Sequence, residues 1–175
     1  MNKRLIALLC GSVMALSLTG CGEKAETGVV IENASVDSIS KASTKYFYEQ
    51  SSLNGQELVD AINSRKGTFT YATTNEDGSP NLAIFGFGMI DEKYAMAGIT
   101  ENQTLQNLKR NKIGVVSFYQ YNAEATDKFE RNKGARLVIK VVEDQAKIDE
   151  LKAKSEGKSG DTSTFFEVVE IKPLG

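Results

Sequence analysis

The sequence predicts a mainly β domain of the α+β class, with six mostly antiparallel strands and short flanking helices. Three observations predict it. Apolar and polar residues alternate in short segments such as 68–74, where Phe69, Tyr71 and Thr73 share one face. Short turns join successive strands, which favours antiparallel pairing. The helical segments are short and apolar on one side, so the chain fits a small barrel or a sheet with helices at its ends.

The first half of the domain is expected to contain one helix and three strands. The helix begins near Asn54 and carries the apolar stripe Leu58, Val59 and Ile62. The expected strands lie at 68–74, 81–90 and 94–99. The turn after the first strand contains Asp-Gly and Pro, which are typical turn residues.

A second helix, from about 101 to 111, follows the third strand directly. Thr100 and Gln103 match a capping box, and Leu105 and Leu108 give the helix an apolar face. Free N–H groups and the positive end of the helix dipole meet at such a helix start. The pattern therefore favours a phosphate near Thr100.

The second half of the domain is expected to add three strands and one helix. The strands lie at 113–121, 135–143 and 164–172, and the helix lies at 144–154. Strand 113–121 is apolar on both faces, with Val115 and Tyr119 on one and Val116 and Phe118 on the other. Both faces must then be covered, by core and helix or by core and a second subunit.

Composition excludes several classes of function. The chain has 175 residues, of which 41% are hydrophobic and 25% charged, as in a globular protein. A net charge of −2 gives no reason to expect nucleic acid as a partner. The chain contains no histidine, which removes the commonest metal ligand and the usual general base. We therefore expect no metal site and no His-dependent triad.

The N-terminus predicts a targeting segment. Lys3 and Arg4 precede the apolar run 5–18, which is too short to span a membrane comfortably. The sequence that follows, Leu18-Thr19-Gly20-Cys21, resembles a bacterial lipobox, so Cys21 is expected to be lipidated; the alternative is a plain signal peptide with an incidental cysteine. The expected division is a lipoprotein signal peptide at 1–20, a tether at 21–52 and a domain at 53–175.

These segments predict where the protein lies. Loss of the signal takes the net charge to −4, so acyl chains and not charge would hold the protein to the membrane. The expected location is the bacterial cell envelope, lipid-anchored and extracytoplasmic. The tether is polar except for Tyr46-Phe47-Tyr48, whose aromatic rings predict that its end packs on the domain.

Residues 70–144 resemble the pyridoxamine 5′-phosphate oxidase-like family of FMN-binding split barrels. Four blocks carry the resemblance, in the family's order and spacing. They are Ala72-Thr73-Thr74-Asn75-Glu76-Asp77-Gly78-Ser79-Pro80-Asn81, Thr104-Leu105-Gln106-Asn107-Leu108-Lys109-Arg110-Asn111, Gly114-Val115-Val116-Ser117-Phe118 and Gly134-Ala135-Arg136-Leu137. The second block is similar to the family's K-T-x-x-N-L-x-x-N helix.

The resemblance implies a six-stranded antiparallel split β-barrel that forms a homodimer, with FMN in a groove at the dimer interface. The family's flavin contacts come from the second and third strands and from the start of the following helix. Transferred to this chain, the cofactor-binding residues are Ile84, Phe85, Gly86, Phe87, Gly98, Ile99, Thr100, Gln103 and Thr104.

Some of these residues have other roles open to them. Gly86 and Gly88 would leave flat backbone for a flavin ring, or would relieve a bend of the barrel. Phe85 and Phe87 fit the core better than a ligand contact. Thr100 and Thr104 can donate hydrogen bonds to a phosphate, or can cap the helix and face solvent.

The chain departs from the family at the phosphate. Family members commonly carry Lys or Arg at or beside Gln103 or Thr104, and this chain has neither there. Three outcomes follow: weak FMN binding, a charge-assisted contact from a basic residue elsewhere such as Arg136, or no FMN binding. Thr104→Glu is expected to abolish FMN retention and to leave the barrel folded.

The sequence thus predicts a membrane-anchored, extracytoplasmic FMN-binding protein with a redox role, which is compatible with a flavin-dependent oxidoreductase. No side chain has the pattern of an acid–base catalyst, so no catalytic residue is predicted. One alternative is a non-enzymatic split-barrel lipoprotein that binds a small ligand or a partner. Another is a barrel that binds deazaflavin or haem, although the missing histidine disfavours haem.

Overall fold

The computed structural model describes residues 45–175 of the chain. The predicted signal peptide, Cys21 and most of the predicted tether lie outside the described residues. No helix within 45–175 has the length and apolar character needed to cross a bilayer.

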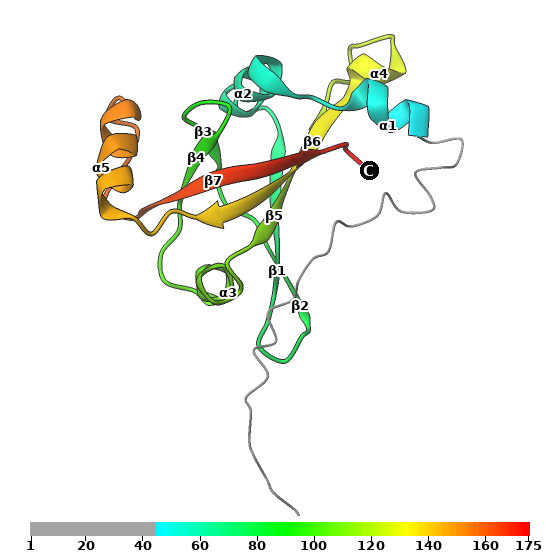
Figure 1. The fold of residues 1–175 in the computed structure, drawn as a ribbon. Coiled ribbons are helices and arrows are strands. Elements are labelled where there is room, and N and C mark those ends of the chain that lie inside the picture. Colours follow the sequence, from blue (N-terminus) through cyan, green and yellow to red (C-terminus); the bar gives the residue numbers. More distant parts are fainter. Residues whose placement is uncertain (1–44) are drawn as a thin grey trace, which may run out of the picture.

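One antiparallel sheet of seven strands forms the body of the protein (Figure 1). The strands are β1 (Thr68–Thr74), β2 (Pro80–Ala83), β3 (Gly88–Met89), β4 (Tyr94–Gly98), β5 (Gly114–Tyr121), β6 (Asn132–Val141) and β7 (Ser163–Lys172). Their order across the sheet is β2-β1-β5-β6-β7-β4-β3. The mainly β, split-barrel prediction is confirmed, with seven strands in place of six.

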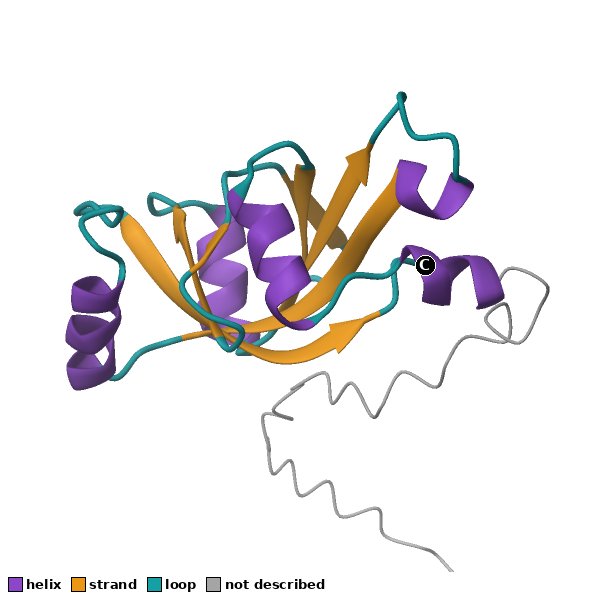
Figure 2. Ribbon diagram, turned by 90° about the horizontal axis from the view of Figure 1, so that it is seen from above, coloured by secondary structure: helices purple, strands orange, loops and turns teal. Residues whose placement is uncertain are grey.

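The sheet curls because its two edge strands are consecutive in the chain. β2 and β3 lie at opposite edges, yet only residues 84–87 separate them. That connection spans at most about 18 Å when fully extended. The two edges must therefore approach each other, which gives the half-barrel seen in Figures 1 and 2.

The predicted single strand 81–90 is broken at this connection, and this corrects the prediction. Residues 84–87 leave the sheet, and Gly86 lies in the connection while Gly88 begins β3. The two glycines therefore do not share one face of one strand. The buried Tyr71 hydroxyl donates a hydrogen bond of 3.1 Å to the Gly86 carbonyl and holds the connection against β1.

Aromatic side chains fill the concave side of the sheet. Phe69 stacks on Phe118 with ring centroids 5.2 Å apart, and Phe87 reaches across to Phe166 at 6.2 Å. All four rings are buried. Because these rings come from β1, β5, the 84–87 connection and β7, their burial ties the two halves of the curled sheet together.

Two helices close the ends of the half-barrel. α2 (Gly55–Asn63) buries the predicted stripe Leu58, Val59 and Ile62, and it packs on β3. α3 (Gln103–Asn111) packs on β1, β2 and β6. Figure 1 shows the two helices at opposite ends of the sheet, and they overlap at the centre of Figure 2, which looks down on that view.

The start of α3 differs from the predicted capping box. The helix begins at Gln103, and the Asn102 side chain caps it by accepting a 3.1 Å hydrogen bond from the Leu105 N–H. Asparagine caps at least as well as threonine, so the cap lies two residues beyond Thr100. Thr100 lies exposed in the loop before the cap.

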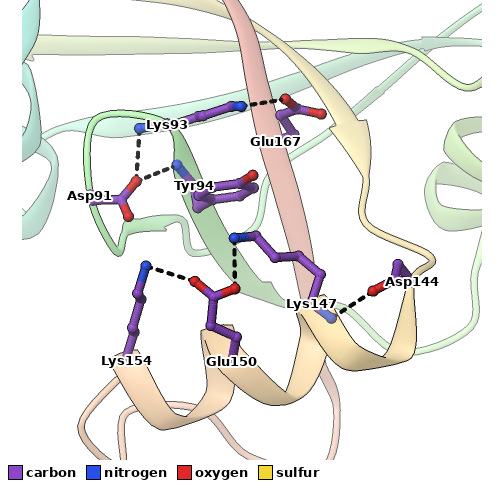
Figure 3. A network of polar contacts seen from close by, with 8 residues as sticks. All are labelled: Asp91, Lys93, Tyr94, Asp144, Lys147, Glu150, Lys154 and Glu167. Carbon is purple, nitrogen blue, oxygen red and sulfur yellow. Dashed lines mark hydrogen bonds and ion pairs between the residues drawn. The ribbon is translucent and has the colours of Figure 1, made fainter.

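α5 (Gln145–Lys154) meets the sheet through one buried residue and one cation, and carries ion pairs along its own surface (Figure 3). Leu151 is its one buried residue. Lys147 lies over the Tyr94 ring at 4.4 Å and bonds Glu150 at 2.9 Å, and Glu150 also pairs with Lys154 at 2.8 Å. A cation over an aromatic face attaches this helix to β4.

The end of the predicted tether is part of the folded body. Residues 45–51 form α1 (Lys45–Ser51), and Phe47 contacts Phe129, which lies in α4 (Lys128–Arg131), at 5.8 Å between ring centroids. The Leu174 N–H donates to Ser52 Oγ at 2.8 Å. The prediction that the aromatic cluster packs on the domain is therefore confirmed for Phe47, and the C-terminus lies beside α1 (Figure 1).

Candidate functional site

A pocket of about 260 Å³ opens between the end of α2, the 84–87 connection, β4 and the loop before β7. It is lined by Arg65, Phe69, Gly86, Phe87, Gly88, Met96, Ala97, Gly98, Lys158 and Ser163. Pockets for drug-sized ligands measure roughly 300–1,000 Å³. A single chain thus supplies room for part of a cofactor.

Glycine backbone forms the open side of this pocket. A side chain at Gly86 or Gly98 would meet no atom within 4 Å, so both positions leave free space beside the backbone. Phe69 and Phe87 close the inner side, and each exposes less than a tenth of its surface. Flat peptide surface facing aromatic rings suits a planar, aromatic ligand, so the residues present fit an isoalloxazine ring.

Two cations complete the pocket. Arg65 and Lys158 are among its lining residues; both are exposed, and neither side chain has a hydrogen bond or an ion pair within residues 45–175. None of the lining residues is acidic. A pocket with two cations and no acid among its described lining residues attracts an anion.

A hydroxyl supplies a third donor. Ser163 Oγ accepts a hydrogen bond of 2.9 Å from the Gly160 N–H, which leaves the hydroxyl hydrogen to donate elsewhere. Ser163 pairs with Gly98 in the register of β4 and β7. The hydroxyl is therefore fixed beside the glycine backbone.

Three of the nine predicted cofactor residues line this pocket: Gly86, Phe87 and Gly98. Ile84 and Phe85 flank them in the same connection, but Ile84 is 72% exposed and Phe85 packs edge-on against Tyr71 at 5.4 Å. Ile99 is buried in the core. Gly86 and Gly98 thus line one pocket, whereas their apolar neighbours lie at the surface (Ile84) or pack in the core (Phe85 and Ile99).

The start of α3 carries the other three predicted residues, and none of them lines the pocket. Thr100 is exposed, and Gln103 donates a 2.9 Å hydrogen bond to Asn107 Oδ1. Thr104 is 3% exposed, and its Oγ1 accepts a 3.0 Å hydrogen bond from Asn81. The Gln103 amide is thus already bonded within α3, and burial of Thr104 keeps its hydroxyl from reaching a ligand.

The burial of Thr104 also corrects an expectation about Thr104→Glu. A glutamate there would place a charge without a cationic partner among buried groups, which costs several kcal/mol. The variant would therefore destabilise the barrel itself. Thr104→Val removes only the hydroxyl and is the more informative change.

The basic residues considered from the sequence have other partners in the structure. Arg136 does not line the pocket, and its Nε donates to the Pro173 carbonyl at 2.8 Å. At the end of α3, Lys109 pairs with Glu101 at 3.0 Å and Lys112 pairs with Glu143 at 2.7 Å.

Sequence reasoning missed Arg65 and Lys158. The sequence placed the phosphate at the start of α3 and named Arg136 as a substitute cation, whereas Arg65 follows α2 and Lys158 lies in the loop before β7. Nothing in the sequence pattern distinguishes either residue from the other exposed cations of the chain.

Residues 45–175 contain no cluster of acidic, cysteine and histidine side chains that could hold a metal ion. Met96 is the one soft donor that lines the pocket.

Burial raises the pKa of Tyr71 far above its ordinary value, so its hydroxyl stays protonated and keeps its bond to Gly86.

Comparison with known proteins identifies the architecture. No family model matches the chain, and no curated protein matches it. Among solved structures, a histidine-to-alanine variant of HupZ from Group A Streptococcus is similar, at 23% identity over 70% of this chain and 100% of that chain, with a TM-score of 0.50.

Two further solved structures share the outline at lower similarity. An FMN-binding protein from Syntrophomonas wolfei is 17% identical over 75% of this chain and 88% of its own, with a TM-score of 0.47. HutZ, the heme storage protein from Vibrio cholerae, is 15% identical over 69% of this chain and 91% of its own, with a TM-score of 0.41. At such identities a likeness concerns the fold, so the ligand must be argued from this chain's own residues.

Proposed function

We propose that this protein binds FMN in the glycine-lined pocket and takes part in electron transfer outside the cytoplasm. The observation that carries the proposal is the composition of the pocket. It combines open backbone at Gly86 and Gly98, the rings of Phe69 and Phe87, and the cations Arg65 and Lys158. A planar aromatic ring system attached to a phosphate has these three complementary properties.

The flavin would supply the redox chemistry, and the chain would supply position and surroundings. Gly86 and Gly98 let the ring approach the backbone, and the buried phenylalanines keep water from its inner side. No lining residue is a carboxylic acid or a histidine that could transfer a proton. This surrounding favours electron transfer over acid–base catalysis.

The size of the pocket supports a homodimer. One chain encloses about 260 Å³, too little for a whole FMN, so a second copy would complete the groove. The convex face of β2, β1 and β5 offers the contact surface. Leu82, Ala72 and Val115 stand side by side in the register of these strands, and Leu82 is 70% exposed.

The protein would act at a membrane surface through lipid on Cys21. The support is the lipobox-like sequence, because this segment lies outside the described residues. Fractionation of bacterial cells tests the anchor. We expect the protein in the membrane fraction, and we expect Cys21→Ser to release it; wild-type protein in the soluble fraction contradicts the anchor.

The experiment that tests FMN binding is the visible spectrum of the full chain purified in detergent. Protein with bound flavin is yellow, and a colourless preparation should acquire a protein-bound flavin spectrum when FMN is added. A preparation that stays colourless and leaves FMN fluorescence unchanged rejects the proposal. It would favour the alternative of a non-enzymatic split-barrel lipoprotein that binds a different small ligand or a partner.

Haem remains a second candidate because of one residue. Met96 lines the pocket, and a thioether can ligate haem iron. The same spectrum decides, since haem gives a Soret band and flavin does not. Met96→Leu would remove a haem spectrum and leave a flavin spectrum in place.

A further inference from the structure

We propose that Arg65 and Lys158 bind the phosphate of the cofactor at the side of the pocket, in place of the start of α3. This inference rests on the proposed FMN function and adds the residues that hold the anion. Both side chains line the same pocket although they lie far apart in the sequence. No acidic residue accompanies them among the lining residues.

The fold fixes the position of Arg65. Asn63, the last residue of α2, clamps β3: its Nδ2 donates to the Met89 carbonyl and its Oδ1 accepts from the Met89 N–H, both at 3.0 Å. Ile62 anchors the same turn in the core. Arg65 follows two residues after this clamp, so its side chain starts from an immobilised helix end beside the pocket.

The backbone conformation at Arg65 is that of a helix end. Its φ is 56°, and Lys112 and Glu156 take the same left-handed conformation after α3 and α5. Glycine would adopt this conformation without the β-carbon penalty, which makes Arg65→Gly a usable variant.

Hydrogen bonds also fix the loop that carries Lys158. The Lys158 backbone N–H donates to the Ser155 carbonyl at 3.0 Å. The buried Ser155 Oγ bonds Ser159 Oγ at 2.7 Å, and the loop then closes through Gly160 and Ser163. The ammonium group therefore approaches the pocket from a loop that is ordered on both sides of it.

Electrostatics favours a dianion between these two side chains. Both residues are exposed, and neither side chain is neutralised by an acidic partner within the described residues, so both charges are available to a ligand. An FMN phosphate carries up to two negative charges and accepts hydrogen bonds from guanidinium, ammonium and hydroxyl groups together. Ser163 offers the hydroxyl in the same pocket.

The start of α3 is a poorer site for the same group. Gln103 already donates to Asn107, and burial of Thr104 keeps its hydroxyl from a ligand. Lys109, on the same helix, pairs with Glu101. A phosphate there would compete with existing bonds and with the Glu101 charge.

The test compares the affinities for FMN and riboflavin, which differ only in the phosphate, by flavin fluorescence on the full chain in detergent. We expect wild-type protein to prefer FMN. Arg65→Gln and Lys158→Gln should each weaken FMN binding about tenfold to a hundredfold and leave riboflavin binding within about twofold. The matched control is Lys66→Gln, because Lys66 is an exposed neighbouring cation that does not line the pocket.

A second variant separates binding from folding. Arg65→Gly removes the guanidinium and relieves the positive φ, so the thermal unfolding midpoint should stay or rise while the FMN preference falls. Unchanged FMN preference in Arg65→Gln and in Lys158→Gln overturns the proposal. So does loss of the preference in Thr104→Val alone, which would return the phosphate to α3.

Failure of the FMN proposal can be recognised separately. If wild-type protein binds neither flavin, inorganic pyrophosphate replaces FMN, and its binding is followed by calorimetry. Binding that Arg65→Gln abolishes and Lys66→Gln preserves upholds the two-cation site without flavin. No pyrophosphate binding to wild-type protein overturns the site.

Discussion

Tyr71 shows how one buried side chain shapes the candidate site. Its ring is fully buried between Phe85 and Phe87, and its hydroxyl donates to the Gly86 carbonyl at 3.1 Å. Because that bond connects β1 to the 84–87 connection, it fixes the backbone on which a flavin would lie. Packing in the core and geometry in the pocket thus depend on one residue.

Tyr71→Phe is expected to lower the free energy of unfolding by about 1 kcal/mol, because one hydrogen bond is lost and the ring remains. FMN binding should weaken as the Gly86 backbone loosens. Urea unfolding measures the stability, and Tyr119→Phe is the control, since the Tyr119 hydroxyl bonds Asn132 at an exposed site. An equal loss in both variants would contradict the role of Tyr71.

The same residue predicts an alkaline transition. Burial raises the pKa of Tyr71 above its ordinary value near 10, so the unfolded chain releases the proton first. The stabilisation is complete below pH about 10 and is lost as the pH rises above it. Tyr71→Phe should therefore flatten the decline in stability above pH about 10, measured by urea unfolding over that range; parallel curves for the two proteins would speak against it.

Single residues also set the limit of what the sequence could predict at the site. Gly86 and Gly98 were predicted because the resemblance places the family's flavin contacts on the second and third strands, and both residues line the pocket. Arg65 and Lys158 could not be predicted, because each is an exposed cation in a polar segment and only the curled sheet brings them to one pocket. The expectation for Thr104 was wrong because its partner Asn81 lies on β2, far from α3 in the sequence.

At the scale of elements, the strands and helices could be predicted where local pattern decides them. β1 has the predicted bounds, and α2 buries the predicted stripe. The prediction of one strand at 81–90 was wrong. The alternation of residue types continues through 84–87, but the chain crosses there from one edge of the sheet to the other. α4 was missed because four residues capped by Asp127 leave no periodic pattern.

The attachment of α3 depends on a polar network and not on its apolar face alone. Asn107 is fully buried and makes four side-chain hydrogen bonds, to Thr73, Asn75, Gln103 and Arg110. Asn107→Ala should lower the free energy of unfolding by about 2–4 kcal/mol, because it opens a cavity and leaves partners unsatisfied.

Urea unfolding measures this loss, and Asn111→Ala provides the comparison on the same helix. Asn111 is half-buried and donates one hydrogen bond, to the Thr74 carbonyl at 2.7 Å. Its replacement should cost about 1 kcal/mol. If the two variants lose equal stability, the network around Asn107 has no special weight in holding α3.

α5 should respond to acid more than the rest of the fold. Hydrogen bonds from Lys154 and Lys147 lower the pKa of Glu150 from 4.5 to about 2. A lowered pKa in the folded state means that the stabilisation is complete above pH about 4.5 and is lost as the pH falls toward about 2. Amide hydrogen exchange in α5 should therefore accelerate over this range before the sheet is affected.

Glu150→Gln should remove that acid dependence and make exchange in α5 faster at neutral pH. Glu92→Gln is the matched control, because Glu92 is exposed and has no hydrogen bond or ion pair within the described part of the chain. Exchange in α5 that is insensitive to pH in the wild-type protein would show that Leu151 and the Lys147–Tyr94 contact hold the helix without Glu150.

For the whole molecule, the distribution of charge distinguishes one face of the sheet. β1, β2 and β5 contain no charged residue on either face. On the convex side, Leu82 and Ile84 are about 70% exposed, Tyr121 is 57% exposed and Tyr119 39%. A surface of this kind on a chain that is one-quarter charged is characteristic of a protein interface.

The two-sided apolar pattern of 113–121 was the one sign of this face in the sequence. The structure covers the Val116 and Phe118 side with the core and leaves Tyr119 and Tyr121 exposed. Sequence pattern could therefore indicate that a second cover is needed. The pattern could not show whether a helix or another subunit covers this face. The answer depends on the positions of α2 and α3, which both lie at the ends of the barrel.

Leu82→Glu tests whether a second copy supplies that cover. In a two-fold dimer the substitution places two carboxylates in one apolar contact, so the dissociation constant should rise at least about a hundredfold. Analytical ultracentrifugation in detergent measures the change, and Val169→Glu on β7 is the control, since Val169 is 41% exposed outside this face. If each chain contributes only half of the flavin groove, FMN affinity must fall together with dimerisation in Leu82→Glu and recover at high protein concentration. A monomeric wild-type protein that binds FMN with full affinity would show instead that the pocket of one chain is sufficient.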